Sequence, residues 1–327
     1  MGYLTKKRKI LCIGVLMLPL LSCNMKSKSN TKITDCLVVN TLSILESNMK
    51  NQKEWIKVHA AEFMLWSGYP DGVKELFIRE EQLYGDISPY RIGIWRVLMQ
   101  TETELQQKEV WIDKLRQAYF DKNSTDRLHA IETLAKLEVP VFGDETKLSD
   151  IFTGGIPDSF SIYKLWNFAY TSDENFEIVQ ELLLRFSVSE QYDFSTRSIS
   201  LYALRKLGIL KDSSWKILSD STLSESNKNP IKVNLLTTAI ITANNNAIQT
   251  DSYKEIWDNL LSLSRNEEKN NVCMNVLEAF AEKGGRDELE IISALIDKKK
   301  GLDDPQSVDV LSYCAFAILR IKHIESF

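Results

Sequence analysis

The feature that most constrains this chain is a helical period of about 35 residues that runs through nearly all of it. Beyond Asp35 the apolar residues recur every three or four positions, and almost no stretch alternates for long enough to form a strand. Helical hairpins are predicted at 35–67, 70–102, 106–137, 144–171, 173–208, 211–243, 251–283 and 286–322. One hairpin cannot bury its own apolar face, so neighbouring hairpins must share a core. The predicted fold class is all-α, an α-α superhelix of about eight helical hairpins over residues 35–327.

The second helix of each hairpin carries the clearest register. A basic residue stands near its start and is followed by small or apolar residues; these basic residues are Lys57, Arg91, Arg127, Arg197 and Lys232. An apolar anchor follows in each helix, at Met64, Leu98, Leu134, Leu204, Ile240 and Phe280. Stacking these anchors predicts one continuous core. The hairpin at 144–171 is the weakest, because Gly154-Gly155 interrupts it and predicts a bend or a loop.

Two of these helices carry a more specific pattern. Lys57 leads into Ala60-Ala61-Glu62, and Arg127 leads into Ala130 and Glu132. On these residues the chain resembles HEAT-repeat proteins, especially the bacterial phycobilin-lyase-like subset. The resemblance covers most of residues 50–245 and fades after 265, where the basic position is lost. It implies a HEAT-like solenoid, and because such folds serve many purposes it implies no particular activity.

The first residues depart from the helical pattern. The basic run 6–9 precedes a short apolar run, 10–21, and Ser22-Cys23 follows directly. Residues 1–22 resemble a bacterial lipoprotein signal peptide, which implies cleavage before Cys23 and a lipid on its sulfur. The polar residues 23–34 are predicted to be a flexible tether. The expected location is the cell envelope, lipid-anchored on the periplasmic or surface side, and Asn24 favours the outer membrane by its resemblance to known sorting patterns.

Charge and cysteine content exclude some classes of protein. The net charge of −5 offers no broad basic field, so nucleic acid is not an expected partner. Three cysteines remain beyond the predicted anchor, at positions 36, 273 and 314, with no metal-finger spacing. The second and third of these lie in apolar stretches and are predicted to be small core residues.

Stacking the repeats brings charged residues together. In this register Glu62 lies beside Arg96, and Arg96 beside Glu132, which predicts an acid–base–acid column. The same stacking places His59 and His129 on either side of Gly93, a position with no side chain.

Aromatic residues accompany the column. Trp55, His59, Glu62 and Trp66 share one face of a helix by the three-and-four rule, and this face is distinct from its core stripe. The candidate ligand-binding residues are therefore Trp55, His59, Glu62, Trp66, Arg91, Trp95, Arg96, His129 and Glu132. The arginines could hold a carboxylate or sulfate, and the tryptophans could stack on a sugar ring or an extended peptide.

Three interpretations of this column stay open. It can be a structural charge ladder at a helix seam, a ligand-binding groove, or a catalytic or metal site. Deoxyhypusine hydroxylase, a HEAT-repeat enzyme, binds two irons through adjacent His-Glu pairs. Here the spacing is His-x-x-Glu, and Arg96 would place a positive charge between the copies, which disfavours a metal.

The standard enzyme motifs are missing from the sequence: it has no nucleophile elbow, no phosphate-binding loop, no dinucleotide fingerprint and no His-Glu-x-x-His. No cofactor or catalytic residue is assigned. The sequence favours a membrane-tethered scaffold that binds a protein or an anionic glycan on its concave face. The alternative is an envelope enzyme or glycan-processing helper with a His/Glu/Arg pocket. A polysaccharide lyase toroid would share these helical features, but it would need a closed ring and a Tyr or His in a cleft.

Overall fold

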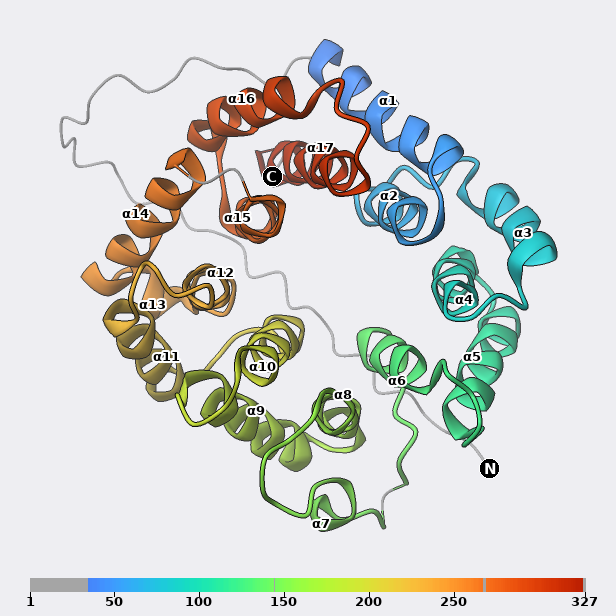
Figure 1. The fold of residues 1–327 in the computed structure, drawn as a ribbon, viewed down its shortest axis with the longest axis horizontal. Helices are drawn as coiled ribbons and strands as arrows, with labels where there is room; N and C mark the ends of the chain where they lie inside the picture. Colours follow the sequence, from blue (N-terminus) through green and yellow to red (C-terminus); the bar gives the residue numbers. More distant parts are fainter. Residues whose placement is uncertain (1–34, 144, 267–268, 326–327) are drawn as a thin grey trace, which may run out of the picture.

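The computed structural model describes residues 35–143, 145–266 and 269–325, and the regular secondary structure of these residues is entirely helical, without strands. The predicted signal peptide, Cys23 and the tether lie outside the described residues. The helices form two concentric layers that close into a ring (Figure 1). The all-α superhelix expected from the period is confirmed, and its curvature is high enough to bring its last hairpin against its first.

The first helix of each hairpin lies in the outer layer and the second in the inner layer (Figure 1). The outer helices are α1 (Asp35–Asn51), α3 (Val73–Tyr84), α5 (Leu105–Phe120), α7 (Leu148–Ile151), α9 (Asp173–Val188), α11 (Asp212–Ser224), α13 (Asn245–Ile248), α14 (Asp251–Asn266) and α16 (Leu289–Lys299). The inner helices are α2 (Glu54–Trp66), α4 (Tyr90–Thr101), α6 (Arg127–Lys136), α8 (Ser159–Phe168), α10 (Phe194–Leu207), α12 (Lys232–Ile241), α15 (Asn270–Lys283) and α17 (Pro305–Glu325). Two 3-10 turns, Ala169–Thr171 and Arg286–Glu288, complete the described helices.

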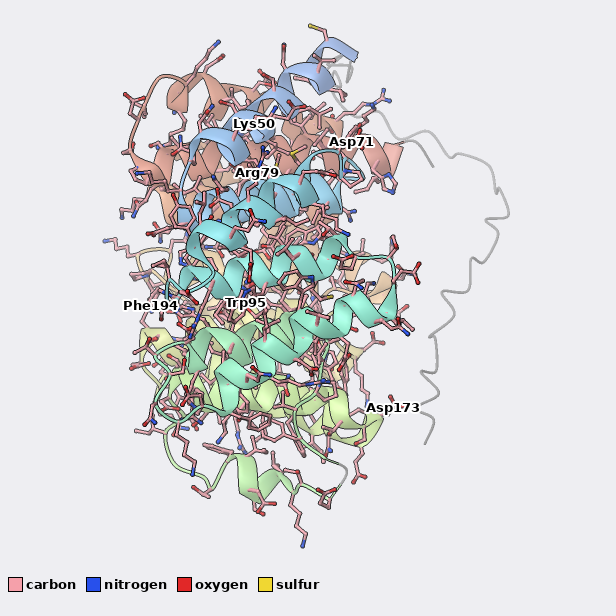
Figure 2. The ribbon with its side chains drawn as sticks, turned by 90° about the vertical axis from the view of Figure 1, so that its right-hand side faces the viewer. Lys50, Asp71, Arg79, Trp95, Asp173 and Phe194 are labelled. Carbon is pink, nitrogen blue, oxygen red and sulfur yellow. The ribbon has the colours of Figure 1, made fainter. Side chains whose placement is uncertain are left out.

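Each hairpin folds back on itself, so the inner helices all run in one direction. Asp71 and Asp173 follow inner helices and lie toward one end of the ring, whereas Phe194 begins an inner helix and lies toward the other (Figure 2). We call the first of these the exit end, because the inner helices finish there.

The closing seam joins α17 to α1 and α2. The buried side-chain amide of Asn48 donates to the backbone oxygen of Val308 at 3.2 Å and to Ser312 Oγ at 2.9 Å. Phe63 and Phe316 stack across the seam with ring centroids 4.6 Å apart and planes inclined by 12°. Specific polar and aromatic contacts therefore hold the two ends of the superhelix together.

In three of the five repeats the recurring basic residue acts within its own hairpin. Arg127 Nε donates to the Tyr119 oxygen at 2.9 Å, and Arg197 Nε donates to the Ser187 oxygen at 3.0 Å. Lys232 Nζ likewise donates to the Thr222 oxygen at 2.6 Å. Each acceptor lies in the last turn of the preceding outer helix, whose carbonyls lack helical partners. In these three repeats the basic residue therefore caps the outer helix and fixes the hairpin. Lys57 pairs instead with Glu80, and Arg91 with Asp126, each in the next hairpin.

The core lies between the two layers and runs around the ring. All the predicted anchors are buried in it, at Met64, Leu98, Leu134, Leu204, Ile240 and Phe280. Gly154 and Gly155 adopt positive φ angles of 94° and 87° in the loop after α7, where a residue with a side chain would be strained. Among the described helices, none combines the length and apolar character needed to cross a bilayer.

Candidate ligand pocket inside the ring

A cavity of about 420 Å³ lies inside the ring, enclosed by side chains from α2, α4, α6, α10, α15 and α17. Its lining consists of His59, Glu62, Phe63, Trp66, Arg96, Gln100, Lys136, Leu137, Tyr202, Lys206, Glu278, Glu282, Tyr313, Phe316 and Arg320. These residues belong mainly to the later turns of their helices, so the cavity lies toward the exit end. We call it the ring pocket.

The lining follows the repeat in two tiers. Equivalent positions of four inner helices, α2, α4, α10 and α15, supply Glu62, Arg96, Tyr202 and Glu278, all of which line the pocket. One helical turn further along, the same helices supply Trp66, Gln100, Lys206 and Glu282, and α6 adds Lys136. Because the inner helices are parallel, one position in the repeat becomes one level of the pocket wall.

One wall of the pocket is aromatic and spans the seam. Phe63 stacks on Phe316, and the edge of Tyr313 meets Phe63 at a centroid distance of 4.8 Å. Trp66 meets Phe316 edge-on at 5.9 Å and is 45% exposed, so part of its indole is available to a ligand. Trp66 Nε1 donates to Gln100 Oε1 at 2.7 Å, which fixes the orientation of the ring.

The opposite wall is basic. Lys136 and Lys206 each place their ammonium 5.3 Å from the centre of the Tyr202 ring. Lys136 pairs with Glu132 at 2.8 Å, and Lys206 pairs with Glu278 at 2.9 Å. Burial alone would raise the pKa of the Glu278 carboxyl, but the positive charges of Arg205 and Lys206 lower it to about 2. The glutamates are therefore ionised, and they hold the ammonium groups at the pocket wall.

The predicted pair Glu62 and Arg96 meets directly. Arg96 Nε and Nη2 each donate to a different carboxylate oxygen of Glu62 at 2.7 Å. Gln100 Nε2 donates to the same carboxylate at 2.8 Å. Burial alone would raise the pKa of Glu62, yet the adjacent Arg96 charge keeps it below its ordinary value. With the pair so engaged, its clearest role is as a strut that fixes α2 against α4.

At Glu132 the column continues through charge and not through a hydrogen bond. The charge of Arg96 helps to lower the pKa of Glu132, but the carboxylate of Glu132 pairs with Lys136. The hydrogen bond from Arg96 to α6 goes to Thr133 Oγ1, at 3.4 Å. His129 Nδ1 lies 3.8 Å from the Glu132 carboxylate on the same helix. Glu132 therefore supports a lysine of the pocket wall and is not itself among the lining residues.

The predicted pairing of two histidines around Gly93 is wrong. A Cβ atom at Gly93 would lie 2.8 Å from Val58 Cγ2 and 3.1 Å from Trp55 Cζ3, so these side chains occupy the space that the glycine leaves. Trp55 then reaches His129, with 5.5 Å between ring centroids. His59 turns instead toward the seam.

At the seam, His59 Nδ1 lies 3.1 Å from each carboxylate oxygen of Asp309. These two residues lie 250 positions apart in sequence and meet only because the ring closes. His59 also lines the ring pocket, and 30% of its side chain is exposed. The seam therefore contributes a carboxylate-bound imidazole to the pocket.

Arg91 and Trp95 do not join the other candidates. They line a separate cleft of about 600 Å³ formed with α3 and α5. Arg91 and Lys114 both lie 5.4 Å from the Trp95 ring centre, and Arg91 pairs with the buried carboxylate of Asp126. Of the nine predicted residues, His59, Glu62, Trp66 and Arg96 line the ring pocket; Trp55, His129 and Glu132 belong to the adjacent inner wall.

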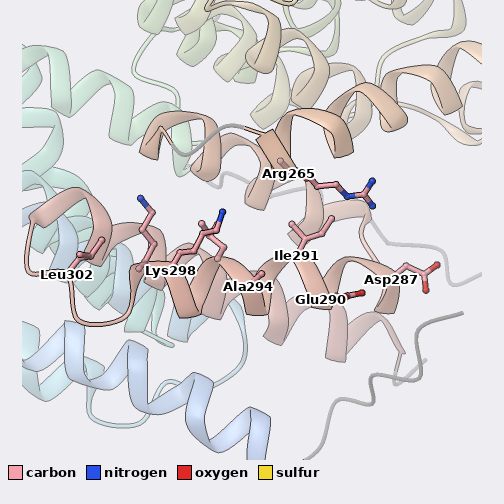
Figure 3. Close-up of a pocket in the computed structure, with 10 residues that line it drawn as sticks. Arg265, Asp287, Glu290, Ile291, Ala294, Lys298 and Leu302 are labelled. Carbon is pink, nitrogen blue, oxygen red and sulfur yellow. The ribbon is translucent and has the colours of Figure 1, made fainter.

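A further groove of about 600 Å³ lies on the outside of the ring, between α14 and α16. Figure 3 shows Ile291, Ala294 and Lys298 along α16, with Arg265 extending from the end of α14. Its charged residues Arg265, Asp287 and Glu290 are exposed. The ring pocket combines fixed charges with aromatic faces, which makes it the better candidate for specific recognition. The described residues contain no cluster of three or more His, Cys, Asp or Glu side chains that could hold a metal ion.

Sequence reasoning missed much of the pocket. Gln100, Lys136, Lys206 and Glu282 lie one turn beyond the column positions, so extending the same register by four residues would have found them. Asp309, Tyr313, Phe316 and Arg320 come from α17, and only ring closure brings them to α2. Their approach to α2 has no counterpart in the repeat period.

No protein-family model, curated protein sequence or solved structure matches this chain. The class of protein is therefore defined by the fold and the pocket alone: an all-α superhelix closed into a ring with a polar and aromatic cavity inside it.

Proposed function

We propose that this protein binds an acidic sugar unit of a glycan in the ring pocket, from a position anchored to the cell envelope. The observation that carries the proposal is the pairing of an aromatic wall, made by Phe63, Trp66 and Phe316, with a basic wall that bears Lys136 and Lys206. A sugar presents an apolar ring face and polar edges, and an acidic sugar adds one negative charge.

The size of the cavity supports a small ligand or the end of a chain. Small-molecule sites usually enclose about 300–1,000 Å³, and the ring pocket at about 420 Å³ lies in the lower part of that range. Closure turns the concave face of the described residues inward, toward the ring pocket. A glycan inserted end-on fits this geometry better than a partner laid along a solenoid.

A further cation of the pocket, Arg320 on α17, is not fully used by the protein. Arg320 lines the pocket, and its ion pair from Nη2 to Glu282 is long at 3.9 Å. Its buried Nε atom has no hydrogen-bond partner among the described residues. The planar guanidinium of Arg320 can therefore bind a ligand carboxylate at close distance without breaking a strong salt bridge within the protein.

The proposed anchor fits the direction of the pocket. Helix α1 runs antiparallel to α2, so it begins at the exit end, toward which the pocket also lies. A lipid at Cys23 would thus hold this end toward the membrane surface. Membrane-associated acidic glycans would then be presented on the side where the pocket is found.

The test is titration calorimetry of the chain from residue 24 onward with uronic acid oligosaccharides, and with the same oligosaccharides after carboxyl reduction. We expect the acidic forms to bind and the reduced forms to bind at least about tenfold more weakly, because hydrogen bonds to charged groups contribute about 1.5–3 kcal/mol. Trp66→Ala and Arg320→Met should each lower affinity by about tenfold or more.

Lys216→Met is the matched control. Lys216 is highly exposed on outer helix α11, so its substitution removes one positive charge far from the pocket. It should bind as the unchanged chain does. Failure of all acidic oligosaccharides to bind at millimolar concentration would refute the proposal, as would equal affinity for the reduced forms.

A further inference from the structure

The ring pocket contains two polar groups that make no internal hydrogen bond. His59 contacts Asp309 through Nδ1 only, which leaves Nε2 without a partner among the described residues. The Tyr313 hydroxyl also has no hydrogen-bond partner in this part of the chain. Both residues line the cavity, and their ring centroids lie 6.2 Å apart in an edge-to-face arrangement.

Asp309 determines which nitrogen of His59 can accept a proton. A carboxylate only accepts hydrogen bonds, so Nδ1 must carry the hydrogen that it donates to Asp309. In the neutral imidazole, Nε2 is then the unprotonated nitrogen. The arrangement is that of a general base held by a positioning residue.

Tyr313 can act as a proton donor beside this base. Burial raises the pKa of its phenol well above the ordinary value, and the negative charge of Asp309 acts in the same direction. The phenol is therefore protonated at neutral pH and can donate its proton to a group that leaves with negative charge. A base and an acid thus lie side by side on one wall of the pocket.

The cations that line the pocket supply what proton abstraction from carbon requires. Removing a proton next to a carboxylate places additional negative charge on that carboxylate, which is unfavourable in water. Lys136, Lys206 and Arg320 line the same cavity and can neutralise this charge as it develops.

We propose that the ring pocket is the active site of an eliminase that cleaves acidic glycans, with His59 as the base and Tyr313 as the acid. This inference rests on the proposed binding of an acidic sugar. The C–H bond beside the carboxylate breaks and its proton passes to His59 Nε2. The electron pair forms a C=C bond as the neighbouring C–O bond breaks, and the departing oxygen takes the Tyr313 proton. Proton return from His59 to Tyr313 through solvent restores the site, so no other reactant is consumed.

The experiment incubates the chain from residue 24 onward with the uronic acid oligosaccharides used for binding, and follows the ultraviolet absorbance of the unsaturated carboxylate. Mass spectrometry should find two fragments whose masses add to that of the substrate, with no water gained. Hydrolysis would add one water, so fragments of that mass would overturn the proposal.

Substitutions separate chemistry from structure. His59→Asn retains an amide N–H in the place of Nδ1 for Asp309 and removes Nε2, so it should keep the seam intact while lowering kcat about 100-fold or more. Tyr313→Phe should act similarly, with little change in KM for either variant. Asp309→Asn should lower kcat less than His59→Asn does, because it acts through the orientation of the imidazole.

Binding measured on the same samples distinguishes the two proposals. Oligosaccharides that bind but give no unsaturated product would overturn the eliminase and leave the binding function standing. Full activity in His59→Asn or Tyr313→Phe would also overturn it.

Discussion

The buried pair of Glu62 and Arg96 allows a quantitative test of its role as a strut. In Arg96→Met the side chain keeps most of its volume but loses both bonds to the Glu62 carboxylate, whose side chain is only 4% exposed. A buried charge left without its partner typically costs about 3–5 kcal/mol of stability. We expect the free energy of unfolding of Arg96→Met to fall by about this amount at pH 7, as measured by urea denaturation with circular dichroism.

Two further measurements test the electrostatic origin of that loss. The double variant Glu62→Gln with Arg96→Met carries no buried charge at this place, so it should recover about 2 kcal/mol or more of the loss. In the single variant, burial without Arg96 raises the pKa of Glu62 above its value in the unfolded chain. The stability deficit should then shrink as the pH falls from 7 to 5, because the protonated carboxyl is neutral.

In the unchanged protein the contribution of Glu62 to stability depends on pH in the opposite direction. The pKa of Glu62 is lowered by folding, so its contribution is present above the unfolded pKa and is lost as the pH falls through the folded value. A loss below about 1 kcal/mol in Arg96→Met, or a double variant as unstable as the single one, would refute the strut.

Other substitutions test the seam, the packing of the inner layer and the buried thiols. Asn48→Ala should destabilise the fold by about 1–3 kcal/mol in urea denaturation, because it leaves buried seam groups without their donor; no measurable change would contradict the seam. Gly93→Ala should lower the free energy of unfolding by about 1–3 kcal/mol in thermal denaturation, because the added methyl group overpacks the inner layer. A stabilised variant would show that the neighbouring side chains move aside to accommodate it. In the chain from residue 24 onward, only the exposed Cys36 should react rapidly with a thiol reagent, since Cys273 and Cys314 are buried and burial raises the pKa of Cys314; rapid labelling of all three would contradict the predicted core positions.

The hairpins could be predicted because their signals are local. The 3.6-residue periodicity and the turns between helices placed each predicted hairpin where the structure has one. The pair of Glu62 and Arg96 was also predictable, since neighbouring repeats stack in register. The weak hairpin at 144–171 is real, although α7 is only four residues long.

The contacts that could not be predicted from the sequence depend on side-chain volume and on the curvature of the superhelix. The pairing of His59 with His129 assumed that the space beside Gly93 stays open, but the large indole of Trp55 fills it. The approach of Asp309 depends on the small rotation between successive repeats, which accumulates around the ring. A repeat period gives the order of neighbours and does not give this rotation, so the part of the pocket wall that α17 supplies was not visible in the sequence.

Because the ring is closed, the number of hairpins in the chain is constrained during evolution. An open solenoid tolerates duplication or loss of a unit, because each unit touches only the next. Here a gained or lost unit would separate the residues that meet between α2 and α17, including His59 and Asp309. The copy number of hairpins is therefore tied to the chemistry at the junction, and we expect variation among descendants of this chain to be confined to its loops and outer surface.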